Sequence, residues 1–247
     1  MPSRQDPPRY YSTCRPYARH KPLRPVFRLF RRLVSACVPR HRTLWAEGVP
    51  PAEPVVFVCN HARAYGPLSM CTRFPRNFRP WIVSNMCFVR QVPAYARVDF
   101  WPGNTPFQRA LRWVLSVLIA LPAAWIMTGV EGIPVYHDSR VLETFRKSVQ
   151  TLQEGKDIVL FPEIPDGTGL YLDAFADGFV LLGSRWAAAT GKSLRFYPVY
   201  ACQRLRTFFV GEAVAYDPAG DGAAQRESLC AALHAAMNGL RERADKL

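Results

Sequence analysis

The stretch Val55-Val56-Phe57-Val58-Cys59 runs directly into Asn60-His61. Five consecutive apolar residues, three of them β-branched, predict a strand that is buried on both faces, as in a parallel sheet. A second run of this kind, Ile158–Phe161, leads into Pro162-Glu163. Functional groups of α/β proteins gather just beyond the carboxyl ends of such strands. His61 and Glu163 are therefore the first candidates for chemistry.

Similar short apolar runs recur along the chain, and helix-like segments separate most of them. We expect further strands at Trp81–Ser84, Ile133–Tyr136, Phe196–Tyr200 and Phe208–Val210. We expect helices at roughly 105–129, 139–154, 174–190 and 223–244. Buried strands that alternate with helices predict a three-layer α/β fold, with a mostly parallel sheet and helices on both faces.

The positive charge is concentrated at the beginning of the chain. The 247 residues carry a net charge of +13, and residues 1–45 hold eleven Arg and Lys against the single acid Asp6. Residues 1–21 are polar and interrupted by prolines, so we expect a disordered basic arm there. Residues 22–45 are expected to form an amphipathic basic helix for a membrane interface rich in anionic lipid. The alternative is a helix packed on the domain with a solvated arginine face. Residues 46–247 are expected to form the main domain.

Residues 113–130 contain no charge and are interrupted by Pro122. As a helix they would be about 27 Å long, which approaches the hydrocarbon thickness of about 30 Å. A single membrane span is possible on length alone.

Several other classes of function lack their usual signatures. The seven cysteines include no C-x-x-C pair, and no H-E-x-x-H occurs, so we expect reduced thiols, no metal site and no bound cofactor. No nucleic-acid-binding motif accompanies the basic arm, and we expect no nucleic-acid partner. No G-x-S-x-G nucleophile motif is present, which disfavours a serine hydrolase.

Two further segments carry polar groups next to expected strands. The glycine-bearing loop around Asp166 and Gly167 follows Glu163, and its N–H groups could hold an anion, although an ordinary turn has the same composition. Arg140 lies at the start of an expected helix, where a cation is unfavourable for the helix dipole. We therefore consider Arg140 for phosphate binding.

Four segments in this order resemble the glycerolipid acyltransferases, a family that includes the lysophosphatidic acid acyltransferases. The four blocks are Asn60-His61, Gly132-Ile133-Pro134-Val135-Tyr136, Leu160-Phe161-Pro162-Glu163 and Tyr197-Pro198-Val199. The similarity covers about residues 45–215. The resemblance implies that His61 and Glu163 share one site, whereas a single membrane span over 113–130 would place them on opposite sides of a membrane. We therefore expect 113–130 to be a re-entrant segment, a surface-inserted segment or a buried helix, in a peripheral or monotopic protein at the cytoplasmic face.

The resemblance implies transfer of a fatty acyl group from acyl-CoA or acyl carrier protein to the hydroxyl of a lysophospholipid or glycerol phosphate. His61 would be the general base, because an alcohol is a poor nucleophile until its proton is taken. Glu163 would support His61 or hold the acceptor. The substrate-binding residues would be Asn60, Arg63, Arg140, Phe161, Pro162, Asp166 and Gly167.

The chain departs from the family pattern five positions after the histidine. The family has an aspartate there that orients the imidazole, whereas this chain has Gly66. Three interpretations stay open. Another carboxylate replaces it, with Asp99, Glu163 and Asp166 as candidates; His61 works through a backbone carbonyl or water; or the protein binds lipid without transferring acyl groups.

Overall fold

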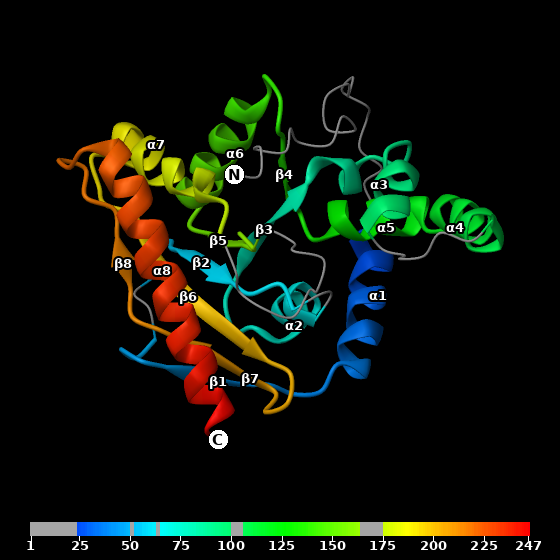
Figure 1. Cartoon of the computed structure of the whole chain (residues 1–247), viewed down its shortest axis with the longest axis horizontal. Coiled ribbons are helices and arrows are strands. Elements are labelled where there is room, and N and C mark those ends of the chain that lie inside the picture. The colour runs from blue at the N-terminus through cyan, green and yellow to red at the C-terminus, as the bar shows by residue number, and fades with distance from the viewer. Residues whose placement is uncertain (1–23, 50–51, 63–64, 100–105, 164–174) are drawn as a thin grey trace. The chain divides into compact units, whose positions relative to one another are not determined.

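The computed structural model describes residues 24–49, 52–62, 65–99, 106–163 and 175–247 (Figure 1). The helices are α1 (Arg24–Cys37), α2 (Tyr65–Arg73), α3 (Val92–Asp99), α4 (Pro106–Leu118), α5 (Ala120–Gly129), α6 (Val141–Gln153), α7 (Leu181–Thr190) and α8 (Gly222–Asp245), with 3-10 turns η2 (Ser84–Cys87) and η3 (Asp177–Val180). The strands are β1 (Arg42–Trp45), β2 (Val56–Cys59), β3 (Phe78–Val83), β4 (Ile133–Val135), β5 (Asp157–Leu160), β6 (Arg195–Cys202), β7 (Thr207–Val210) and β8 (Val214–Ala215).

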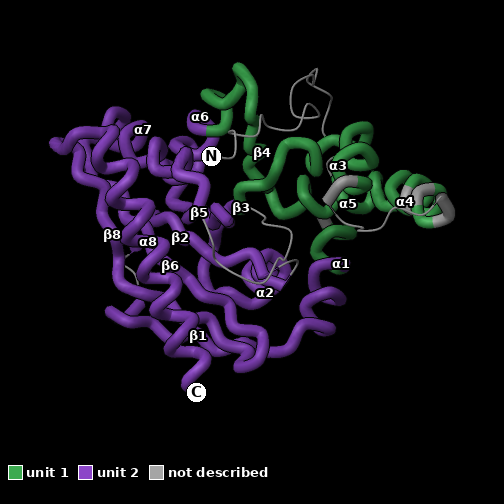
Figure 2. Tube along the Cα trace, in the orientation of Figure 1, with its two compact units in different colours: residues 1–29, 80–144 green, residues 30–79, 145–247 purple. Residues whose placement is uncertain are grey.

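The chain divides into two compact units (Figure 2). The larger unit contains Phe30–Arg79 and Phe145–Leu247, and the smaller unit contains the residues up to Leu29 together with Pro80–Thr144. The candidate residues His61 and Glu163 both belong to the larger unit and so lie within one compact body.

In the larger unit, β1, β7, β6, β2 and β5 lie side by side in this order, and β8 also pairs with β6. The strand β2 runs parallel to both of its neighbours, β5 and β6. The pair β1–β7 is also parallel, whereas β6 is antiparallel to β7 and β8. The strand that carries His61 at its end is therefore an interior strand.

Helices pack on both faces of this sheet. Successive side chains of a strand point to opposite faces, so each strand contributes side chains to both. On one face Phe57 and Tyr197 share a hydrophobic cluster with Phe74, which follows α2. On the other face Phe209 packs in a cluster with Ala244 of α8. Figure 1 shows α8 crossing the sheet along β6.

In the smaller unit, β3 and β4 are parallel, with Trp81 opposite Ile133. The helices α3 and α5 bury a cluster that includes Val92, Ala96 and Ala124. Together with the larger unit, these pairings confirm the predicted α/β class with a mostly parallel sheet. The strands β1 and β8 and the helices α2 and α3 were not predicted.

The segment expected as one helix over 105–129 is two helices. The helix α4 ends at Leu118 and α5 begins at Ala120, which places Pro122 in the first turn of α5, where a missing N–H is tolerated. A continuous helix would instead place Pro122 in its interior, and this explains the break. None of the helices within the described ranges is both long enough and apolar enough to cross a membrane.

The range 22–45, expected as one amphipathic helix, also contains a strand. The helix α1 ends at Cys37, and Arg42–Trp45 form β1, which pairs with β7. Only part of the apolar face of α1 is covered: Phe27 is 9% exposed, whereas Leu29 and Leu33 are 59% and 61% exposed. Residues 1–21 lie outside the described residues.

Candidate functional site

The two strands β2 and β5 bring His61 and Glu163 to the same edge of the sheet. They are parallel neighbours, with Val58 opposite Leu160, so their carboxyl ends coincide. The Glu163 carboxylate reaches the chain that follows β2, and its Oε2 accepts a hydrogen bond of 2.7 Å from the main-chain N–H of His61. His61 and Glu163 therefore lie close together in the larger unit, as the strand pattern predicts.

Glu163 contacts the backbone of the His61 turn. Its carboxylate also bonds the N–H of Ala62, and Ala62 has a left-handed backbone with φ of 42°. Such a conformation costs a non-glycine residue about 1–2 kcal/mol, which the two hydrogen bonds to Glu163 offset. Burial raises the pKa of the Glu163 carboxyl, and the bonds from His61 and Ala62 act in the opposite direction.

Asn60 directly follows β2, and its side chain bonds the neighbouring strand β6. It is 4% exposed, and its Oδ1 accepts a 2.7 Å hydrogen bond from the N–H of Ala201 in β6. Its Nδ2 lies 3.5 Å from the carbonyl oxygen of Ala201. With both ends of its carboxamide directed at β6, Asn60 fixes the end of β2 against β6.

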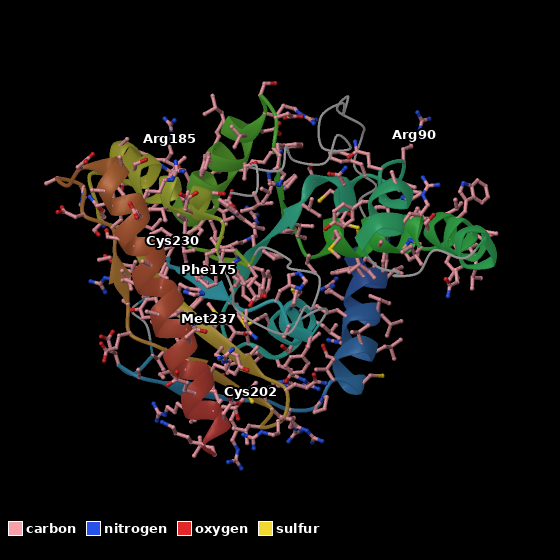
Figure 3. The ribbon with its side chains drawn as sticks, viewed as in Figure 1. Arg90, Phe175, Arg185, Cys202, Cys230 and Met237 are labelled. Carbon is pink, nitrogen blue, oxygen red and sulfur yellow. The ribbon has the colours of Figure 1, made fainter. Side chains whose placement is uncertain are left out.

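The His61 side chain is exposed, and its ring lies edge-on to Phe161, with the two ring centroids 5.5 Å apart. The carbonyl oxygen of Pro162 accepts a bond of 2.8 Å from the N–H of Ala176, and Glu163 forms a β-bridge with Phe175. Figure 3 labels Phe175 near α8, where its ring contacts that of His234. Pro162 and Glu163 are thus held by the segment that begins at Phe175.

Gly66 leaves no room for a side chain. Its N–H donates a 3.0 Å hydrogen bond to the carbonyl oxygen of His61. A Cβ atom at this position would lie 2.2 Å from the carbonyl oxygen of Asn60 and 2.7 Å from that of His61. The turn into α2 therefore requires glycine, and an aspartate, as in the acyltransferase pattern that the sequence resembles, has no space at this position.

The other residues predicted for the site lie in the smaller unit or outside the described residues. Arg140 belongs to the smaller unit, where it forms a 2.7 Å ion pair with Asp138 and lies 4.3 Å above the centre of the Tyr136 ring. Hydrogen bonding from Arg140 lowers the pKa of the Asp138 carboxyl. Arg63, Asp166 and Gly167 lie outside the described residues, and Asp99 ends α3 in the smaller unit.

His41 and Tyr65 form a pair that the sequence did not indicate. Nδ1 of His41 lies 2.8 Å from the carbonyl oxygen of Pro39, so this nitrogen carries the proton of the neutral ring. Nε2 then accepts from the Tyr65 hydroxyl at 2.5 Å. Burial raises the pKa of Tyr65 to about 12 and lowers that of His41. The pair depends on β1, which has no clear periodicity in the sequence.

Within the described residues, no group of three or more His, Cys, Asp or Glu side chains could hold a metal ion. Among the described residues, the site contains the exposed imidazole of His61, the Glu163 carboxylate that fixes the main chain of His61, and the Phe161 ring beside the imidazole. A positioned imidazole of this kind can accept a proton from a bound hydroxyl.

No protein-family description matches the chain, and no curated protein matches it. Among solved structures, the chain is similar to the crystal structure of the 1-acyl-sn-glycerophosphate (LPA) acyltransferase PlsC from Thermotoga maritima. The two are 14% identical, the match covers 89% of this chain and 79% of that chain, and the TM-score is 0.44. At this identity the similarity concerns the fold only.

Proposed function

We propose that this protein transfers a fatty acyl group from a thioester donor to the hydroxyl of a glycerolipid acceptor, with His61 as general base. The observation that carries the proposal is the exposed imidazole at the shared edge of β2 and β5, with its main chain held by Glu163. Three of the four acyltransferase-like blocks, those at Asn60, Glu163 and Pro198, fall on the neighbouring strands β2, β5 and β6 or directly after them.

The reaction needs one proton acceptor that later becomes a donor. The His61 imidazole takes the proton from the acceptor hydroxyl while that oxygen attacks the thioester carbonyl carbon. The tetrahedral intermediate then breaks its carbon–sulfur bond, and the imidazolium returns the proton to the departing thiolate. A positioned base of this kind contributes about 10²–10⁴ to the rate. Because position 66 has no side chain, the fixed backbone and Phe161 orient the ring in this proposal.

The substrates follow from the resemblance in the sequence. The donor is acyl-CoA or acyl carrier protein, and the acceptor is a lysophospholipid or glycerol phosphate. Arg63, Arg140, Asp166 and Gly167 stay predicted contacts for the phosphate or the donor. If Arg140 is such a contact, its guanidinium binds a phosphate while it also forms the ion pair with Asp138.

A membrane surface is part of the proposal. In the smaller unit, α4 and α5 expose six large apolar side chains, which we call the α4–α5 apolar face: Leu111, Trp113, Val114, Val117, Leu118 and Leu121. Contiguous exposed apolar surface of this kind marks an interaction site, and tryptophan favours the membrane interface. The +10 charge of residues 1–45 suits an anionic leaflet. The protein would therefore be peripheral or monotopic at the cytoplasmic face.

A transfer assay with acyl-CoA and lysophospholipid on vesicles tests the activity. We expect wild type to form the diacyl product and His61→Ala to lower kcat by about 100-fold or more. Ser184→Ala is the matched control, because the Ser184 hydroxyl bonds the carbonyl of Leu181 and has no role in the proposal. Equal rates for wild type and His61→Ala would refute His61 as base, and loss of activity in Ser184→Ala would favour a serine nucleophile.

A second candidate is a relative that binds lipid without transferring acyl groups. The observation that favours it is the lack of space for a side chain at Gly66. In the serine protease triad, an imidazole without its orienting aspartate loses about 10⁴ in turnover. Wild type that binds vesicles but is as inert as His61→Ala with every donor and acceptor would support this candidate.

A further inference from the structure

Four exposed arginines gather at the connection between β6 and β7 and at the beginning of β1. We call them the arginine patch: Arg40, Arg42, Arg204 and Arg206. The N–H of Arg42 donates a 3.0 Å hydrogen bond to the carbonyl oxygen of Arg206, which joins the two segments. Figure 3 labels Cys202 at the end of β6, where this connection begins.

The positive charge of the patch is not neutralised by partners among the described residues. None of its four guanidinium groups forms an ion pair with a described carboxylate, and Arg204 donates from Nη2 to the carbonyl oxygen of Ala244 at 2.5 Å. Glu242 and Asp245 belong, like Ala244, to the last turn of α8. The positive excess is therefore greatest around Arg40, Arg42 and Arg206.

Arg206 occupies a backbone conformation that disfavours arginine. Its φ is 49°, in the left-handed region, where a residue with a Cβ loses about 1–2 kcal/mol relative to a glycine. Its side chain is exposed, so packing does not explain an arginine there. Strained positions that keep a charged, exposed side chain are candidates for a binding role.

The patch lies at the same sheet edge as His61. The carboxyl end of β6 is bonded to Asn60, one residue before His61, and the β6–β7 connection continues from that end. Arg42 in β1 is three strands away from β2, in the order β2, β6, β7, β1. With a strand spacing of about 4.8 Å, the patch begins next to the site and extends to roughly 14 Å from it.

We propose that the arginine patch binds the phosphate groups at the nucleotide end of a coenzyme A thioester, and so makes acyl-CoA the donor. This rests on the proposed function. In coenzyme A a pantetheine arm separates the thioester from the phosphates, so a phosphate site belongs at a distance from the base and not beside it. Arginine bonds phosphate through two parallel N–H groups, which suits a cluster of phosphates better than a single carboxylate.

Calorimetric titration of the full chain with free coenzyme A tests the patch without requiring turnover. We expect Arg206→Gln to weaken the Kd for coenzyme A by about tenfold, as for loss of one charge-assisted hydrogen bond. Arg195→Gln is the matched control: it removes the same charge from an exposed arginine at the opposite end of β6, and it should leave Kd unchanged. Coenzyme A without its 3′-phosphate should bind wild type more weakly.

Arg206→Gly separates binding from folding. Glycine is favoured at this φ, so the variant should be at least as stable as wild type in thermal unfolding and still bind coenzyme A about tenfold more weakly. An unchanged Kd in both Arg206 variants would overturn the proposal. Weaker binding to phosphatidylglycerol vesicles with an unchanged Kd for coenzyme A would also overturn it, and would assign the patch to lipid headgroups.

The outcomes for the patch and for the proposed function are distinguishable. Wild type that binds coenzyme A through Arg206 but transfers no acyl group would support the patch and refute the transferase. Wild type that transfers from acyl-CoA with a KM insensitive to Arg206→Gln would refute the patch and leave the transferase standing.

Discussion

Hydrogen bonds fix the main chain at His61 and at Gly66. Glu163 accepts hydrogen bonds from the beginning of the turn, and the N–H of Gly66 donates back to the carbonyl oxygen of His61. Of the three carboxylates that the sequence offers as replacements for the missing aspartate, Glu163 therefore acts on the backbone of His61. In the proposed mechanism Glu163 is therefore a positioning residue, because it holds the main chain of His61.

Introducing an aspartate at position 66 should damage the fold and should not raise activity. In Gly66→Asp the new Cβ would overlap the carbonyl oxygen of Asn60, since the two atoms would be 2.2 Å apart. Overpacking of this kind costs about 1–3 kcal/mol of unfolding free energy. Chemical denaturation measures the loss, and the transfer assay measures the rate.

Gly239→Ala is the control for replacing a glycine. An added Cβ there meets no atom within 4 Å, and Gly239 lies inside α8. We expect that variant to gain about 0.5–1 kcal/mol. A stable Gly66→Asp variant with increased turnover would refute the steric argument.

The raised pKa of Glu163 predicts a pH-dependent stability. A carboxyl whose pKa is higher in the folded state contributes stability below its unfolded value of about 4.5, and this contribution is lost as the pH rises through the folded value. Relative to Glu163→Gln, which does not titrate, wild type should therefore lose unfolding free energy between acidic and neutral pH. Denaturant unfolding of both proteins across this range measures the difference, and a difference that favours wild type increasingly with pH would contradict the burial effect.

At the scale of elements, α4 and α5 leave six large apolar side chains exposed in the smaller unit. Both helices have one buried side, with Ser116, Ala120 and Ala124 inside, and leave their larger apolar residues in solvent. A helix pair with this exposure is unusual unless another surface covers it. The proposed cover is the interface of an anionic bilayer.

Polar substitutions on the α4–α5 apolar face should weaken vesicle binding. The pair Trp113→Ser and Leu118→Ser removes two side chains that are 57% and 65% exposed. Burial of such groups in lipid contributes about 1.5–3 kcal/mol each, so we expect at least a tenfold loss of affinity in vesicle flotation. Leu142→Ser, at a leucine 60% exposed on α6, is the control and should bind as wild type does. Equal losses in both variants would indicate nonspecific adsorption.

At the scale of the whole molecule, a buried ion pair ties separate segments of the larger unit together. Asp157 accepts from Arg76 Nε at 2.7 Å and from the N–H of Val55 at 3.0 Å. The two charged side chains are 17% and 4% exposed for Arg76 and Asp157. This contact joins the beginning of β5 to the segment that enters β2, the two strands whose other ends carry the candidate site.

Asp157→Asn should lower the stability of the whole chain. It leaves the Arg76 guanidinium without its carboxylate, and breaking a buried pair costs about 3 kcal/mol or more. Glu53→Gln is the control, because Glu53 and Lys192 are 3.9 Å apart and 66% and 67% exposed, and such pairs contribute about 0–1 kcal/mol. Calorimetric unfolding measures both, and equal effects would show that Asp157 has no special structural role.

Local sequence patterns determined the α/β class, the central strands and the proximity of His61 to Glu163. Apolar runs report burial on both faces, and parallel strands bring their carboxyl ends to one edge. Only the tertiary structure decided that Glu163 bonds the backbone of the His61 turn, that Gly66 has no room for a side chain, and that His41 meets Tyr65. These contacts join residues far apart in the chain or depend on atomic distances within a turn. The spacing of apolar residues along the sequence predicts neither kind of contact.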